Sequence, residues 1–316
     1  MNAERIERSA SGKIILCGEH SVVYGRPAIA VPVSMMRTYA CVDPAPKGSG
    51  LQIHALDLQQ RLTLKDVGNE HPLALGTRLV LEHLMAPEPD VVLTLRSELP
   101  IAAGLGSGAS VAAATARALG AALGTELSPE VISEITYEVE KIHHGNPSGI
   151  DNTVIAWEKP VYFVRGNAPE TFSIHTPFKL LIAYSGIAGS TRTAVAEVRK
   201  RWEAAPGYYD VIFNCIGTIS KAARAAVEQG EIETLGALLN ENHELLMKMG
   251  VSLPELDSLA QAARRAGALG AKMTGSGYGG NIIALVEDAT TAAVEEALSS
   301  AGAPQIWETL VGQPDG

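Results

Sequence analysis

The chain has 316 residues, a length that suits about two domains. Hydrophobic residues make up 46% and charged residues 19%, a balance that is typical of a folded globular protein and excludes wholesale disorder. The formal net charge of −10 makes nucleic acids and membrane surfaces poor partners, although a loop of backbone N–H groups can still hold a phosphate.

The cysteines and the N-terminal residues favour a cytoplasmic protein. Cys17, Cys41 and Cys215 are an odd and scattered set without a C-x-x-C pair. This argues for reduced thiols and against a disulfide scaffold or a cysteine zinc site. The first ten residues carry four charges and no apolar segment, unlike a secretory signal, and no apolar run is long enough to predict a membrane-spanning helix.

Short apolar or alternating segments predict mainly strands in the first hundred residues, at 12–16, 28–33, 37–42, 51–56 and 91–95, with one helix at 73–84. Two helices are then expected, at 107–123 and 128–144. The second has Ser128 as its N-cap, Pro129 at its first position and Gly145 after its end.

The second half repeats the succession of strands and helices. Strands are expected at 161–164 and 179–184, followed by helices over 191–270 with breaks near Pro206, Gly230 and Gly250. Residues 270–286 predict a strand, a glycine turn and a second strand, and a helix at 289–301 and a strand at 305–311 follow. This order predicts an α+β fold, with a boundary between two blocks at 166–177.

A glycine loop at Pro100–Ser110 follows a strand and opens a helix, and it contains Gly104, Leu105, Gly106, Ser107, Gly108, Ala109 and Ser110. Unpaired N–H groups at a helix N-terminus suit a phosphate. The alternative is a tight turn that binds nothing. The loop is not a Walker A motif, and it matches the Rossmann fingerprint only weakly because Ala109 replaces the third glycine.

Three further segments carry candidate groups. Lys13 begins an apolar strand that leads to Glu19 and His20 in a glycine-flanked turn, where they are either polar turn residues or ligands of a hydroxylated or acidic substrate. Glu140 lies near the end of a helix, where a carboxylate opposes the dipole and a divalent cation would remove the conflict. Asp151 follows a Gly/Pro turn. The segment Lys272–Gly280 holds more glycine than a hairpin needs.

Together these segments resemble the GHMP kinase superfamily over nearly the whole chain. The loop Pro100–Ser110 is similar to the motif P-x-x-x-G-L-G-S-S-A, and the run from Thr274 to Gly280 is similar to the C-terminal glycine motif. Within the superfamily the similarity is to mevalonate kinases. It rests on the opening from Lys13 through Gly18-Glu19-His20 to Ala30, on His144-Gly-Asn-Pro-Ser-Gly-Ile-Asp151, and on the helical segment from Asn242 to Asp257.

The resemblance implies two domains: residues 1–172 as an N-terminal ATP-binding domain like the second domain of ribosomal protein S5, and residues 173–316 as a ferredoxin-like C-terminal domain. It implies ATP-dependent phosphorylation of mevalonate to 5-phosphomevalonate in isoprenoid precursor biosynthesis. The expected ligands are ATP, Mg²⁺ and mevalonate, without nucleic acid or membrane. A homodimer is an option that the sequence leaves open.

The resemblance also implies a role for each candidate residue. Asp151 would take the proton from the substrate hydroxyl, and Lys13 beside it would lower the pKa of that hydroxyl and stabilise charge on the transferring phosphoryl group. Arg192 matches a position where the family places a basic residue at the active site. Residues 100 and 104–110 would hold the ATP phosphates. Glu140 and Ser107 would bind Mg²⁺. Substrate contacts would come from Glu19 and His20 and from the glycine motif at Gly275 and Ser276.

Gly108 departs from the family pattern, which has a second serine there as a Mg²⁺ ligand. This departure keeps open a non-catalytic GHMP-fold sensor, although such a sensor has no need of Lys13, Glu140 and Asp151 together. A kinase for a related small alcohol, such as phosphomevalonate, is the other alternative. The Glu19-His20 pair and the segment before Asp151 favour mevalonate.

Overall fold

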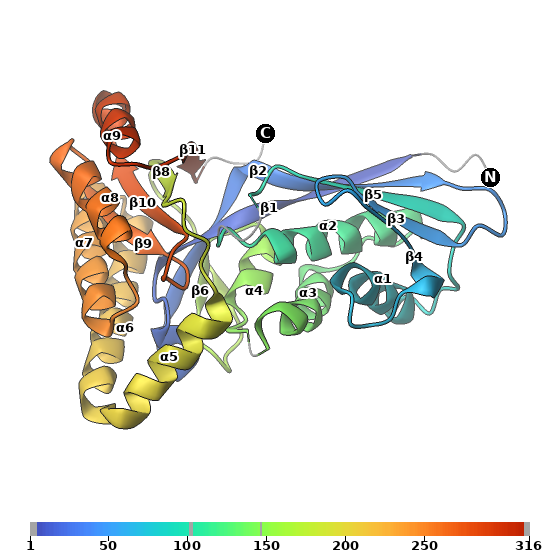
Figure 1. Cartoon of the computed structure of the whole chain (residues 1–316), viewed down its shortest axis with the longest axis horizontal. Coiled ribbons are helices and arrows are strands. Elements are labelled where there is room, and N and C mark those ends of the chain that lie inside the picture. The colour runs from blue at the N-terminus through green and yellow to red at the C-terminus, as the bar shows by residue number, and fades with distance from the viewer. Residues whose placement is uncertain (1–4, 101–103, 146, 313–316) are drawn as a thin grey trace. The chain divides into compact units, whose positions relative to one another are not determined.

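The computed structural model describes residues 5–100, 104–145 and 147–312 (Figure 1). Packing divides the chain into two compact units. Unit 1 comprises residues 1–12, 36–100 and 106–158, and unit 2 comprises residues 13–35, 101–105 and 159–316. Because each unit is assembled from separate stretches of chain, the division does not follow chain order, and the boundary expected at residue 172 stays a prediction.

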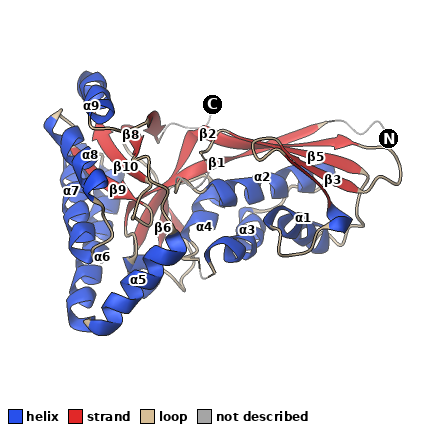
Figure 2. Cartoon of the chain, in the orientation of Figure 1, coloured by secondary structure: helices blue, strands red, loops and turns tan. Residues whose placement is uncertain are grey.

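Unit 1 contains part of a mixed sheet (Figure 2). Its central pair is antiparallel, with Thr38 opposite Ser97, and the next pair is parallel, with Leu51 opposite Val91. The strands are β1 (Ile6–Cys17), β2 (Ala28–Pro44), β3 (Leu51–Ala55), β4 (Gln60–Thr63) and β5 (Val91–Ser97), and the 3-10 helix η2 (Leu64–Asp66) follows β4. Strands β1 and β2 are long, and the chain of each continues into unit 2.

Four helices of unit 1 pack on one another around α2. They are α1 (Pro72–His83), α2 (Ser107–Ala122), α3 (Pro129–His144) and α4 (Ile150–Trp157). The buried residues of α2 are nearly all small, and six of them are alanines. Small side chains let neighbouring helices approach closely. Helices α2 and α4, with their first turns, therefore belong to the same packed set of four helices.

Unit 2 is built on a four-stranded antiparallel sheet in the order β11-β8-β10-β9. Its strands are β8 (Phe178–Tyr184), β9 (Gly270–Thr274), β10 (Asn281–Val286) and β11 (Gln305–Val311). A smaller set of strands pairs Ala28–Ala30 of β2 with β6 (Val161–Phe163), which pairs with β7 (Glu170–Thr171).

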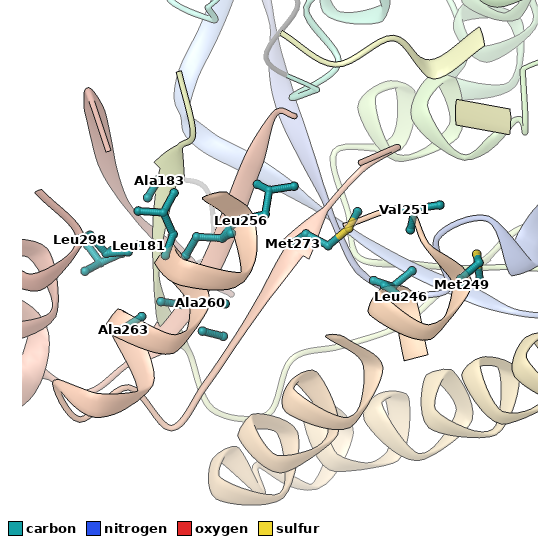
Figure 3. Packing of buried hydrophobic residues seen from close by; sticks show 14 of the residues in the cluster. Leu181, Ala183, Leu246, Met249, Val251, Leu256, Ala260, Ala263, Met273 and Leu298 are labelled. Atoms are coloured by element: carbon teal, nitrogen blue, oxygen red, sulfur yellow. The ribbon is translucent and has the colours of Figure 1, made fainter. Parts of the chain in front are cut away.

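Helices α7 (Ile232–Met249), α8 (Pro254–Arg265) and α9 (Asp288–Ser300) pack on strands of this antiparallel sheet. Helix α6 (Pro206–Gln229) packs on α7, and α5 (Thr191–Ala204) packs on α6. Leu181 and Met273 from the strands meet Leu246, Leu256 and Leu298 from the helices in one hydrophobic cluster (Figure 3). Since successive residues of a strand point to opposite faces, Lys272 and Thr274 lie on the other face of β9.

Helix α7 approaches β9 more closely than a side chain at the contact would allow. A Cβ added at Gly270 would stand 2.1 Å from the Gly236 carbonyl oxygen, and one at Gly236 would stand 2.6 Å from the Leu269 carbonyl oxygen. Both carbonyl oxygens belong to the backbone, so neither can move aside without displacing the helix or the strand. Glycine at both positions therefore lets the helix backbone lie against the strand.

Most of the predicted elements are confirmed, including the α+β class, the cap of α3 at Ser128 and the helix breaks after α5, α6 and α7. One expectation is wrong, because the strands predicted at 28–33 and 37–42 are one strand, β2. Helix α4, whose first turn holds Asp151 after the Gly/Pro turn, was not predicted. Strands β4 and β7 were also missed because they are short. No described helix is both long and apolar enough to cross a membrane.

Candidate functional site

A strained turn between β1 and the 3-10 helix η1 (Ser21–Tyr24) presents Glu19 and His20. Gly18 has φ +106°, and a Cβ there would lie 2.4 Å from the Cα of Ala28. His20 has φ 58° and ψ −47°, a backbone conformation that non-glycine residues rarely adopt. Such strain persists only where the surroundings enforce it, and it concentrates at functional sites.

Glu19 forms a buried ion pair with Lys272 of β9. The Glu19 side chain is 1% exposed and that of Lys272 is 0% exposed, and the Lys272 ammonium donates to Glu19 Oε1. The ammonium also donates to the Met273 carbonyl oxygen over 2.6 Å. Glu19 Oε2 is buried and has no hydrogen-bond partner among the described residues. A hydrogen-bond donor brought by a ligand would satisfy this oxygen.

Burial governs the ionisation of this region. It raises the pKa of the Glu19 carboxyl, while the Lys272 charge opposes that rise. Burial also raises the pKa of the neighbouring Cys17 thiol to about 12, so this cysteine stays protonated at neutral pH. All three cysteines are unpaired, as predicted, with Cys17 and Cys41 buried and Cys215 exposed.

His20 joins the turn to the C-terminal glycine motif. Its Nε2 lies 2.8 Å from the Ser276 carbonyl oxygen, and burial lowers the pKa of His20 to about 4. A neutral imidazole that donates from Nε2 leaves Nδ1 as an acceptor. The Ser276 hydroxyl in turn accepts a hydrogen bond from Thr191 over 3.3 Å. Ser276 therefore connects the Gly18–His20 turn to the first residue of α5.

The predicted residues of unit 2 are thus brought together. Lys13 is 3% exposed, and its backbone N–H donates to Leu105 of the glycine loop over 2.9 Å. The Thr274 hydroxyl donates to the Ile15 carbonyl oxygen over 2.9 Å, which ties β9 to β1. A Cβ on Gly275 would lie 3.9 Å from the Gly104 carbonyl oxygen, so the two glycine segments are neighbours.

Arg192 is an exposed residue in the first turn of α5, next to Thr191. The N-terminus of a helix carries a partial positive charge, so a guanidinium there is unfavourable for stability. An anionic ligand near the helix start would compensate both charges. The position is therefore consistent with the basic role that the resemblance implies for Arg192.

In unit 1 the glycine loop leads into α2. Gly106 is the N-cap with φ 78°, and Ser107 and Gly108 form the first turn. The Ser110 hydroxyl is buried and donates to the Ala10 carbonyl oxygen over 2.9 Å, so it helps to hold the loop against β1. Pro100 precedes the loop, and the motif residues 101–103 lie outside the described part of the chain.

Glu140 and Asp151 belong to the adjacent helices α3 and α4. Glu140 is near the C-terminal end of α3 and 3% exposed, whereas Asp151 is half-buried in the first turn of α4. The Asn152 amide donates to the Ser133 hydroxyl over 2.8 Å and so fixes α4 against α3 beside Asp151. Asn146, in the segment between the helices, lies outside the described residues.

The donors of unit 1 suit a magnesium ion. Mg²⁺ prefers oxygen ligands, keeps several waters, and is usually held by one or two carboxylates together with substrate phosphates. Glu140 offers a buried carboxylate and Ser107 a hydroxyl. Within the described ranges no group of three or more His, Cys, Asp or Glu residues could hold a metal by itself. Phosphate and water oxygens would therefore complete the coordination.

Lys272 is the residue that the sequence analysis passed over. It lies in the strand Gly-Ala-Lys-Met-Thr, whose five residues are all buried. A lysine in an apolar strand directly before a glycine motif is a signal that could have been read from the sequence, because a buried ammonium requires a partner. Its partner, Glu19, is 253 residues away and no local pattern identifies it.

Comparison with known proteins places the chain among kinases. Residues 73–158 match the family described as GHMP kinases N terminal domain, and residues 223–304 match GHMP kinases C terminal. The mevalonate kinase of Thermococcus onnurineus is 37% identical, covering 96% of this chain and 95% of the relative. That of Thermococcus sibiricus is 35% identical and covers 90% of each.

A solved structure of L. major mevalonate kinase in complex with R-mevalonate is similar in fold. Its TM-score is 0.85 at 28% sequence identity, covering 98% of this chain and 97% of that one. This similarity over the full length agrees with the two-domain α+β architecture expected from the sequence.

Replacing Lys272 with methionine is expected to lower the free energy of unfolding by about 3 kcal/mol or more at pH 8, because it leaves the buried Glu19 carboxylate unpaired. Burial raises the pKa of Glu19, so the variant can take up a proton on this group as the pH falls. A carboxyl with a raised folded pKa loses stability as the pH rises through that pKa. The difference in the free energy of unfolding between the variant and the wild type should therefore be smaller at pH 5 than at pH 8.

Lys179→Met is the matched control, since Lys179 of β8 forms ion pairs with exposed Asp288 at the start of α9 and exposed Glu308 of β11. It should leave the unfolding midpoint nearly unchanged, because surface pairs contribute little. Denaturant unfolding at both pH values measures the effect. The buried-pair interpretation would be contradicted if the free energy of unfolding of Lys272→Met were close to that of the wild type. It would also be contradicted if the difference between the two were larger at pH 5 than at pH 8.

Proposed function

This chain belongs to the mevalonate kinase family of the GHMP kinases, and we propose that it transfers the γ-phosphoryl group of ATP to the primary hydroxyl of mevalonate. The product is 5-phosphomevalonate, an isoprenoid precursor. The observation that carries this proposal is similarity over at least 90% of the chain to mevalonate kinases that are 35–37% identical. We propose a cytoplasmic location for the reaction.

The turn at Glu19 and His20 supplies the substrate contacts in this proposal. Glu19 Oε2 is a buried acceptor without a described partner, which suits a substrate hydroxyl donor. His20 is neutral because burial lowers its pKa to about 4, and its Nδ1 can accept a second hydrogen bond. Two acceptors on adjacent residues favour a polyhydroxylated acid over an apolar alcohol. Gly275 and Ser276 belong to the C-terminal glycine motif, which His20 contacts at the Ser276 carbonyl oxygen.

Phosphoryl transfer requires positioning and charge stabilisation rather than covalent chemistry by the protein. We assign proton acceptance from the hydroxyl to Asp151, and stabilisation of the transferring phosphoryl group to Lys13 and Arg192. The N–H groups of Gly104–Ser110 bind the ATP phosphates, with those at the start of α2 aided by the helix dipole. Bound Mg²⁺ supplies charge neutralisation, and Glu140 and Ser107 would hold it.

A coupled assay of ADP release tests the activity. The purified chain is incubated with ATP and Mg²⁺ and with mevalonate, phosphomevalonate, homoserine or galactose in turn. Mevalonate should give the highest kcat/KM. Turnover of a different alcohol instead would reassign the substrate within the superfamily. No turnover with any of the four would favour the sensor function that Gly108 leaves open.

Asp151→Asn and Lys13→Met should each lower kcat by at least about 10²-fold, the scale expected for losing a general base or a charge-stabilising group. Asp151→Asn removes the carboxylate while keeping the shape of the side chain in the first turn of α4. Circular dichroism and thermal unfolding serve as controls for folding. A folded variant with near-wild-type turnover would exclude that residue from the mechanism.

Gly108→Ser should lower the Mg²⁺ concentration needed for half-maximal rate, with a modest effect on kcat. Gly108 is helical in the first turn of α2, so its backbone accepts a serine, and the added hydroxyl is a further oxygen ligand. Glu140→Gln should have the opposite effect and raise the Mg²⁺ requirement. Rates measured over a Mg²⁺ titration decide both. Unchanged titrations would assign Glu140 and this turn a structural role.

A further inference from the structure

Strand β9 is at the end of the four-stranded sheet, and side chains of α7 complete its hydrogen bonding. The Ala271 N–H donates to Asn240 Oδ1 over 2.9 Å, and the Met273 N–H donates to His243 Nδ1 over 3.2 Å. These two amides alternate with Lys272, which is opposite Ile283 of β10. Helix side chains therefore take the place of a neighbouring strand along this edge.

The contact follows one face of α7. Gly236, Asn240 and His243 are spaced by four and three residues, so they lie on the same side of the helix. Gly236 permits the close approach to Gly270 described above. Asn240 and His243 then reach successive outward amides of the strand, and His243 is the member nearest to Lys272.

The bonding of His243 fixes its protonation state. An imidazole nitrogen that accepts from a backbone N–H carries no proton, so the hydrogen of the neutral ring is on Nε2. That atom lies 3.3 Å from Asp257 Oδ1, an electrostatic contact without hydrogen-bond alignment, and Asp257 Oδ1 accepts from the Ser252 hydroxyl over 2.5 Å. Burial, with Arg264 and Lys272 nearby, lowers the pKa of His243 to about 3.

The amide that His243 binds belongs to the peptide bond between Lys272 and Met273. The Lys272 ammonium itself donates to the Met273 carbonyl oxygen over 2.6 Å and to Glu19. The backbone at this point is consequently held from the helix side by His243 and from the opposite face by the Lys272 side chain. A shift of this peptide would move the Lys272 ammonium relative to Glu19.

We propose that His243 is a positioning residue, which holds the Lys272–Met273 peptide through its neutral Nδ1 and thereby keeps Lys272 directed at the Glu19 carboxylate. Asp257, which accepts a hydrogen bond from Ser252, lies 3.3 Å from the other ring nitrogen. The consequence for catalysis rests on the proposed function, because it assumes that Glu19 binds the substrate.

Four variants test the assignment. His243→Leu removes the acceptor, His243→Asn restores an amide oxygen near the position of Nδ1, and His243→Gln places its oxygen near Nε2 instead. Asn240→Leu is the matched control, because it removes an edge hydrogen bond from the same helix two strand residues away from Met273. Kinetic constants for mevalonate and ATP are measured together with the acetylation rate of Lys272 by acetic anhydride, followed by mass spectrometry.

His243→Leu and His243→Gln should raise the KM for mevalonate by about tenfold or more, with the KM for ATP changed by less than about twofold, because only substrate binding at Glu19 is disturbed. Both should also accelerate acetylation of Lys272. His243→Asn should restore both quantities toward wild type. Asn240→Leu should lower the unfolding midpoint without raising the KM for mevalonate.

Two results would overturn the proposal: His243→Asn as impaired as His243→Leu, or Asn240→Leu with an equal rise in the KM for mevalonate. If His243→Leu fails to fold, His243→Gln takes its place in the comparison with His243→Asn. Wild-type protein that does not phosphorylate mevalonate would refute the proposed function alone, since the acetylation rate of Lys272 in the variants still decides the role of His243.

Discussion

Unit 2 depends on one constraint: an ammonium and a carboxylate are buried away from water and must stay paired. Lys272 and Glu19 together expose almost no surface, so each loses its hydration and must recover it from protein atoms. The Met273 carbonyl oxygen provides part of that compensation. The buried pair requires the Gly18–His20 turn and strand β9 to keep a fixed relation, which explains why glycine contacts and side-chain hydrogen bonds surround both segments.

Several candidate groups occupy positions that are unfavourable for folding alone. Glu140 places a negative charge at the C-terminal end of α3, and Arg192 places a positive charge at the start of α5. Each has the sign that the helix dipole opposes, and His20 adds a strained backbone. Asp151 differs, because a carboxylate in the first turn of α4 is favourable. Anionic phosphates and a cation would compensate the first two positions.

Periodicity and glycine spacing were sufficient to predict most elements, because caps such as Ser128 and breaks such as Gly230 are local signals. The same information was insufficient for α4, whose eight residues follow a Gly/Pro turn that masks the start of the helix. In the candidate site the motif residues of unit 2 were predictable and are brought together. Lys272 and His243 were not predicted, since the partner of Lys272 reaches it by a tertiary contact between side chains 253 positions apart, and that of His243 by packing of α7 on β9.

The order of these segments along the chain has a consequence for biosynthesis. A ribosome makes Lys13 and Glu19 well before Lys272, Thr274 and Ser276, since Ile15 and Thr274 are separated by 259 positions in the sequence. Contacts of such large sequence separation require the closure of a long loop, which costs conformational entropy. During translation the Glu19 carboxylate therefore remains solvated, and a nascent chain that ends before β9 lacks the partner for this turn. The Glu19 turn acquires its buried partner only once β9 has been synthesised.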